Sequence, residues 1–85
     1  MKDFIEYLIK NIVNEPEQVD IRVKEGDLRM LIEIRVAPTD VGKVVGNKGR
    51  VIHSLRTIAI SIGMRLGHKV QLEVVQDKEE ALYQK

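Results

Sequence analysis

The stretch that decides the fold is Val41-Gly42-Lys43-Val44-Val45-Gly46-Asn47-Lys48-Gly49-Arg50-Val51-Ile52. It predicts a short helix, a four-residue turn and a longer helix in direct succession. Gly46 stands where a helix would end in the left-handed conformation that glycine adopts freely. Gly49 opens the next helix, whose unpaired N–H groups and positive dipole end attract anions. Lys48 and Arg50 add positive charge and Asn47 adds a neutral donor, so the turn is suited to grip a phosphate.

The segments before this stretch predict one helix and a β-hairpin. Apolar residues at helical spacing indicate a helix over residues 3–13, which Pro16 ends. Two alternating segments, 19–24 and 30–36, predict half-buried strands, and the turn Glu25-Gly26-Asp27 between them predicts that they pair. Leu31 interrupts the otherwise polar face of the second strand. After Pro38, Thr39 or Asp40 is placed to cap the short helix.

The segments after the stretch predict a long helix and a third strand. The helix begins near Gly49 or Arg50 and runs to about Met64, with Ile58 on its apolar stripe and glycines 63 and 67 bracketing its end. Val70, Leu72 and Val74 alternate with polar residues and form the strand. Residues 77–85 predict a polar tail or a short helix, with Asp77 and Glu80 spaced for a capping box.

Together these elements predict an α+β domain with the order α-β-β-α-α-β. The hairpin makes the first two strands antiparallel, and the two-helix crossover makes the third strand parallel to the second. Each strand has one consistently apolar face, so the helices should all cover one side of a three-stranded mixed sheet. Residues 1–76 are expected to form this single domain.

Residues 45–52 resemble the signature of a KH domain, an aliphatic residue, Gly-x-x-Gly, one further residue and two aliphatics. The element order resembles the type II form of that fold. The size of the chain and residues 40–46 are similar to the small stand-alone bacterial KH proteins of the KhpA family. This resemblance implies that the loop binds about four nucleotides of single-stranded RNA. It also implies a cytoplasmic bacterial RNA chaperone or post-transcriptional regulator.

The candidate RNA-binding residues follow from the matched signature and from nearby positive charge. They are Gly46, Asn47, Lys48, Gly49, Arg50, Lys43, Arg56, Val45 and Ile52. The resemblance also implies an aliphatic groove beside the loop, for which Val41, Val44 and either Ile34 or Val36 are further candidates. These aliphatic residues fit core positions equally well.

The distribution of charge supports a polyanion site although the net charge is only +1. Residues 38–69 contain six basic residues and one acidic residue, a local charge of +5. Such a concentration is typical of a nucleic-acid site, although a solvated helix face would look the same. The aromatic residues Phe4, Tyr7 and Tyr83 lie far from the loop in sequence, so base stacking on aromatic rings is not expected.

A single domain of this kind should bind weakly, and a second domain in the same complex would raise its affinity. On the long helix, His53, Ile60 and Met64 lie opposite the core face. They predict a surface for a homodimer, or for a larger KH-containing protein of the Jag (KhpB) type that the resemblance implies. Isolated exposed apolar residues are also ordinary features of a monomer.

Several classes of function are excluded by composition and spacing. The chain has no cysteine, so disulfides and thiolate metal sites are impossible. The glycines do not have P-loop spacing, and His53 and His68 have no convergent catalytic partners, so neither an enzyme nor a cofactor is predicted. No apolar window approaches the roughly 20 residues of a membrane span. Two alternatives stay open: a KH-shaped protein-interaction (dimerisation) module with weak or no RNA binding, and single-stranded DNA as the ligand.

Overall fold

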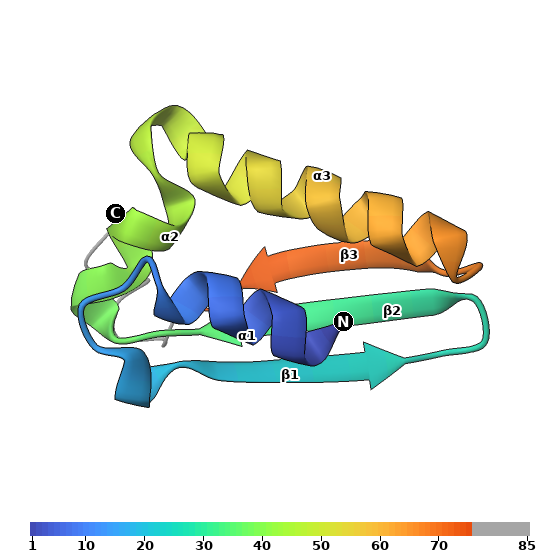
Figure 1. Ribbon diagram of the computed structural model, residues 1–85, viewed down its shortest axis with the longest axis horizontal. Helices are drawn as coiled ribbons and strands as arrows, with labels where there is room; N and C mark the ends of the chain where they lie inside the picture. Colours follow the sequence, from blue (N-terminus) through green and yellow to red (C-terminus); the bar gives the residue numbers. More distant parts are fainter. Residues whose placement is uncertain (76–85) are drawn as a thin grey trace.

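The computed structural model describes residues 1–75, so the expected tail at 77–85 lies outside the described residues. Figure 1 shows the six principal elements, which are α1 (Lys2–Lys10), β1 (Asp20–Glu25), β2 (Arg29–Arg35), α2 (Val41–Val45), α3 (Arg50–Arg65) and β3 (Lys69–Val74). Short 3-10 turns occur at Pro16–Gln18, Pro38–Asp40 and Asn47–Gly49. The predicted order α-β-β-α-α-β is confirmed. In this part of the chain no helix combines the length and hydropathy needed to cross a bilayer.

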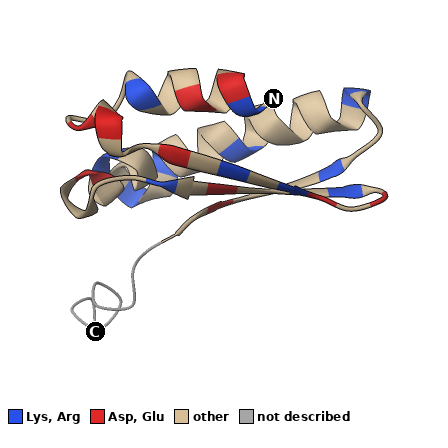
Figure 2. Cartoon of the chain, turned by 90° about the horizontal axis from the view of Figure 1, so that it is seen from below, with Lys and Arg blue, Asp and Glu red and all other residues tan. Residues whose placement is uncertain are grey.

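The three strands form one mixed sheet in the order β1-β2-β3. β1 and β2 are antiparallel, with Val23 opposite Ile32, and β2 and β3 are parallel, with Ile32 beside Leu72. The helices lie on one side of this sheet, and no element of residues 1–75 covers its other face (Figure 2). The α+β class and the mixed sheet follow the prediction from strand alternation.

The core lies between the sheet and the helices. Alternate residues of β2 point into it, and Ile32 and Ile34 are fully buried. From the helical side, Ile5 and Ile9 of α1 are fully buried, as are Val44 of α2 and Ala59 of α3. Burying a large aliphatic side chain completely stabilises the fold by about 1.5–3 kcal/mol, so these residues hold the helices on the sheet.

A close approach at Gly63 holds the end of α3 against β3. A Cβ atom at Gly63 would overlap the Val70 side chain, and it would lie 3.1 Å from the carbonyl oxygen of His68. Gly63 therefore serves packing: it lies inside the last turn of α3, which continues to Arg65, and the glycine with a left-handed conformation after the helix is Gly67.

Asp40 is a fully buried charged residue that joins two distant parts of the chain. Its Oδ1 accepts a hydrogen bond from the backbone N–H of Asn14 at 3.0 Å, and its Oδ2 accepts one from Glu15 at 2.9 Å. The predicted capping role is not observed, because neither Asp40 nor Thr39 makes a side-chain cap bond to α2. α1 ends at Lys10 rather than near residue 13, although the N–H of Val13 still donates to the carbonyl of Ile9 at 3.2 Å.

We expect Asp40→Ala to lower the free energy of unfolding by about 2–4 kcal/mol, because two part-buried N–H groups would lose a charged, fully buried acceptor. The neighbouring Thr39→Ala is the control: its hydroxyl donates only to exposed Glu15 Oε2, at 3.3 Å. That change should stay within about 0.5 kcal/mol. Urea denaturation followed by circular dichroism measures both values, and equal losses in the two variants would contradict the assigned role of Asp40.

Candidate functional site

The site begins where Gly46 ends α2. Gly46 has φ 80° and ψ 173°, a conformation that is essentially restricted to glycine. A Cβ atom there would lie 2.8 Å from Val51 Cβ and 2.9 Å from the Val51 nitrogen. The turn can therefore fold back onto the first turn of α3 only because residue 46 has no side chain.

The rest of the turn keeps its side chains at the surface. The N–H of Gly49 donates to the carbonyl of Gly46 at 3.1 Å and closes a 3-10 turn over Asn47–Gly49. Lys48 has φ 56°, which is uncommon for a residue with a side chain and costs about 1–2 kcal/mol. Asn47 and Lys48 are exposed. Such local strain occurs often at functional sites, so it supports a role for this turn.

Beside the turn lies a concave surface of about 610 Å³, which we call the loop hollow. Its lining residues come from the turn and from the first two turns of α3: Lys48, Gly49, Arg50, Ile52, His53, Ser54 and Arg56. Three of them are basic side chains, and no carboxylate is among them. The loop hollow therefore combines positive charge, backbone N–H groups at a helix start and one aliphatic side chain.

Arg56 links this hollow to the sheet. Its Nε donates to the carbonyl oxygen of Leu72 at 3.1 Å. Leu72 lies on β3, one of the two edge strands of the sheet, so the guanidinium is held at that strand. Because an arginine has five N–H donors, this bond positions the group and leaves capacity for an anion.

The structure brings together only some of the predicted site residues. Lys48, Gly49, Arg50, Ile52 and Arg56 line the loop hollow, and Gly46 and Asn47 complete the adjoining turn. Lys43 and Val45 lie on α2 and do not line it. Val44 and Ile34 are fully buried and Val41 nearly so, so these three serve the core, whereas Val36 is half-buried.

Two lining residues were not predicted for this place. His53, expected on a partner surface, lines the loop hollow beside Arg56. Ser54 was not singled out, and its hydroxyl donates to the carbonyl of Arg50 at 3.0 Å within the helix. The helical period could have identified both, because residues 53 and 56 and residues 50 and 54 each share a helix face.

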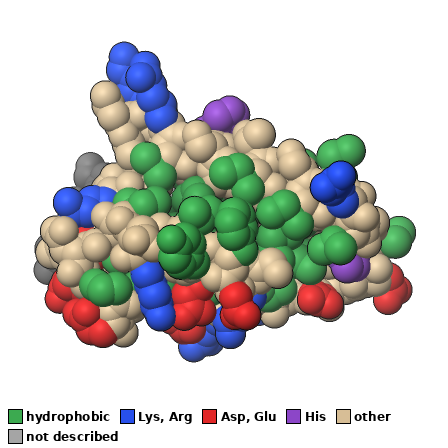
Figure 3. Space-filling model, viewed as in Figure 1, with side chains coloured by type: hydrophobic (Ala, Val, Ile, Leu, Met, Phe, Trp, Pro, Cys, Tyr) green, Lys and Arg blue, Asp and Glu red, His purple; other side chains and the backbone are tan. Residues whose placement is uncertain are grey.

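An apolar groove of about 350 Å³ runs between α1 and α3. Its apolar lining comprises Leu8, Ile12, Val51, Leu55 and Ile58. Figure 3 shows hydrophobic side chains gathered along this seam. Ile58, which its spacing placed on the apolar stripe of α3, lines this groove but is not buried in the core, because it is 39% exposed.

Comparison with known proteins decides the family. The model of the KhpA/KhpB KH domain matches residues 2–74. The chain belongs to this family. It is 44% identical over 78 residues to the RNA-binding protein KhpA of Chlamydia caviae, covering 92% of this chain and all of that protein. It is 38% identical over 76 residues to the RNA-binding protein KhpA of Aquifex aeolicus, covering 89% and 96%. No solved structure matches the chain significantly.

Membership of the KhpA/KhpB family agrees with the geometry of the site. The matched region contains all six principal elements, the turn at Asn47–Gly49 and the residues of the loop hollow. The resemblance inferred from residues 45–52 and from the element order is thereby confirmed.

We expect Gly46→Ala to lower the free energy of unfolding by roughly 2 kcal/mol or more, since it adds backbone strain and a clash with Val51. Gly42→Ala is the matched control, because a Cβ atom at Gly42 meets nothing within 4 Å and the residue lies within α2. Alanine favours a helix, so the control should be neutral or more stable by up to about 1 kcal/mol. Urea denaturation gives both values. An unchanged free energy of unfolding in Gly46→Ala would refute the claim that residue 46 must lack a side chain.

Proposed function

We propose that this protein binds single-stranded RNA through the turn at residues 46–49 and the adjoining loop hollow. The observation that carries the proposal is a strained glycine-flanked turn that opens onto three cations without a carboxylate. The same assignment is supported by relatives that are named RNA-binding proteins and that are similar to this chain over nearly its whole length. We infer that residues 1–76 form its single KH domain, and that the protein acts in the cytoplasm as an RNA chaperone or post-transcriptional regulator.

The proposed contacts divide by chemistry. The backbone at Gly46 and Gly49 lets a phosphate approach closely, and Lys48, Arg50 and Arg56 supply charge around it. Ile52 belongs to the core and is only 7% exposed, so it presents just its edge to a base, and Asn47 offers a neutral donor at the rim. Lys43 and Val45, on the preceding helix, would meet nucleotides further along the strand.

This arrangement implies modest affinity and short sequence preference. Among its lining residues, the loop hollow has no Phe, Tyr or Trp and only the small imidazole ring of His53, so it offers little surface for base stacking. If three or four phosphates are contacted, the logarithm of affinity should fall with the logarithm of salt at a slope of about −2 to −3, at roughly −0.7 for each contact. Single-stranded DNA is the competing ligand, because the lining residues do not by their nature require a 2′-hydroxyl.

We expect the double variant Asn47→Asp/Lys48→Asp to bind short single-stranded RNA at least about tenfold more weakly than wild type, because two carboxylates would face the phosphates. Both side chains are exposed, so circular dichroism should show an unchanged fold. Fluorescence anisotropy of labelled RNA over a series of salt concentrations measures the affinity, and a DNA oligonucleotide of the same sequence measures the preference for RNA.

The matched control is Lys2→Asp/Asn11→Asp, which makes the same two kinds of substitution at exposed positions at the two ends of α1. It should bind RNA nearly as tightly as wild type. If both double variants lost the same amount of RNA affinity, the loss would be explained by the change in net charge rather than by the position of the turn. No binding by wild type, even at low salt, would favour the protein-interaction module instead.

We further propose that two KH domains associate through α3 and so raise the affinity for RNA. Ile60 and Met64 lie one turn apart on α3 and are 44% and 73% exposed. His53 lies on the same side of the helix and also borders the loop hollow, so a partner here would lie next to the RNA. A second copy of the chain is one candidate partner. A larger protein of the Jag (KhpB) type is the other, since one family description covers both kinds of KH domain.

We expect wild type to show the mass of a dimer in light scattering at high concentration and Ile60→Lys to show that of a single chain, because a charge would be buried in the interface. Ile58→Lys is the matched control: it makes the same change at 39% exposure, close to the 44% of Ile60, on another side of α3. A dimer lost through Ile58→Lys alone would place the interface at the apolar groove.

A further inference from the structure

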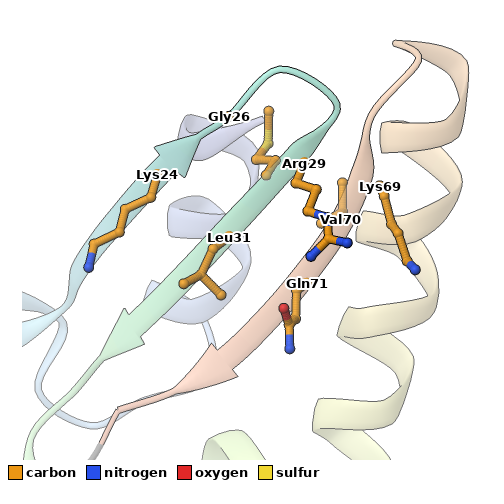
Figure 4. A pocket seen from close by; sticks show the side chains of 8 residues that line it. Lys24, Gly26, Arg29, Leu31, Lys69, Val70 and Gln71 are labelled. Carbon is orange, nitrogen blue, oxygen red and sulfur yellow. The ribbon is translucent and has the colours of Figure 1, made fainter.

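The uncovered face of the sheet carries a second positively charged concavity, which we call the sheet hollow. It has a volume of about 430 Å³ and lies at the hairpin end of the sheet, lined by Lys24, Gly26, Arg29, Met30, Leu31, Lys69, Val70 and Gln71. Figure 4 shows Lys24, Arg29, Leu31 and Gln71 on the side of the sheet that faces away from the helices. The sheet hollow shares no residue with the loop hollow.

Two of its cations are placed side by side. Arg29 on β2 and Lys69 on β3 are direct partners in the parallel pairing, and both are exposed. Like charges opposite each other in a sheet are destabilising. Within residues 1–75, neither Arg29 nor Lys69 forms an ion pair with a carboxylate. An anion bound between them would therefore remove a repulsion that the fold leaves uncompensated.

The remaining charge and shape also favour an anion. Lys24 lies 3.6 Å from Glu33, but its side chain is 69% exposed, so this pair is weak and the ammonium can turn to a ligand. Asp and Glu are absent from the residues that line the sheet hollow. Figure 2 shows Lys and Arg segments near the hairpin end of the strands, next to the acidic segments of the hairpin turn itself.

The residues at the floor of the sheet hollow are suited to contact a base as well as a phosphate. Leu31 is half-buried and interrupts the polar face of β2, and it is the direct partner of Gln71 on β3. The Gln71 amide lies 3.5 Å from Glu73 Oε1, so it is only weakly held. The apolar side chain of Leu31 can contact the face of a base, and the Gln71 amide can bind its polar edge. The two cations, Arg29 and Lys69, can bind the phosphate of the same nucleotide.

We propose that the sheet hollow binds a phosphate-bearing nucleotide belonging to the same RNA strand that occupies the loop hollow. β3 connects the two sites: Lys69 and Gln71 line the sheet hollow, and the carbonyl of Leu72 holds Arg56 of the loop hollow. An RNA strand leaving the loop hollow along the outer side of β3 reaches Lys69. This inference rests on the proposed RNA binding, and it adds a second contact at the opposite end of the sheet.

The length of RNA required can be estimated from the size of the protein. The described chain extends 37 Å along its longest axis. At about 3.4 Å for each nucleotide of a stacked strand, about twelve nucleotides span that length, whereas a KH loop alone grips about four. The test therefore compares labelled oligouridylates of these two lengths by anisotropy over a series of salt concentrations.

We expect Arg29→Gln/Lys69→Gln to bind the short RNA like wild type and the long RNA roughly three- to tenfold more weakly. The salt slope for the long RNA should become shallower by about 1.4, since two phosphate contacts are lost at roughly 0.7 each. The variant should unfold at the same or a higher urea concentration than wild type, because it removes a like-charge pair. Weaker binding therefore cannot be attributed to a loss of structure.

Lys2→Gln/Arg22→Gln is the matched control: it removes one Lys and one Arg, and Arg22 lies on β1 outside the sheet hollow. It should bind the long RNA like wild type. An unchanged affinity and slope for the long RNA in Arg29→Gln/Lys69→Gln would overturn the sheet hollow as an RNA contact. If Asn47→Asp/Lys48→Asp still abolished binding in that case, RNA binding at the loop hollow would be retained and only the contact at the sheet hollow would be rejected.

A last measurement separates an RNA strand from a free nucleotide. Uridine monophosphate is titrated into ¹⁵N-labelled wild type while the amide signals of Arg29, Leu31 and Gln71 are followed by NMR. With the long RNA these signals should shift together with those of Lys48 and Gly49, whereas the mononucleotide should leave them unmoved at equal concentration. Saturation by the mononucleotide at that concentration would assign the sheet hollow to a free nucleotide and refute the RNA contact. Failure of wild type to bind either RNA would refute it together with the proposed function.

Discussion

The contact between the backbone of Gly46 and Val51 controls the direction in which α3 leaves the turn, and the site depends on it. At the other end of the helix, Gly63 lies against Val70 and holds α3 close to β3. Because neither Gly46 nor Gly63 has a side chain, close contacts are possible at both ends of this 16-residue helix. This brings Arg56 close enough to donate to the Leu72 carbonyl, so the cations of the loop hollow have a defined position relative to the sheet.

The protein separates its stable frame from its strained surface. Asp40 is fully buried and accepts two backbone hydrogen bonds, which fasten the connection after α1 to the start of α2. Only a few residues further on, Lys48 is held in a left-handed conformation and is exposed. Strain of this kind persists when the surrounding packing determines the backbone, and the buried aliphatic residues on both sides of the turn provide that packing.

Net charge conceals how the charges are arranged. The chain as a whole is at +1, yet both the loop hollow and the sheet hollow are lined by three cations and by no carboxylate. They lie on different sides of β3, one toward α3 and one on the uncovered face. A protein with this arrangement can attract a polyanion locally without a strongly basic composition, because screening limits the range of a charge to about 10 Å.

The amino-acid sequence by itself determined the order of the elements, the strands and the turn, because period, glycine spacing and turn residues act over a few neighbouring positions. It did not reveal the role of Asp40, because the two N–H groups that this side chain binds lie 25 residues or more away along the chain. Nor did it show Ile58 as exposed or Arg56 as bonded to Leu72, since both depend on how helices pack against other elements. The pairing of Arg29 with Lys69 likewise exists only in the register of two parallel strands. Contacts between distant segments follow from the packing of the whole core, and only the tertiary structure decides them.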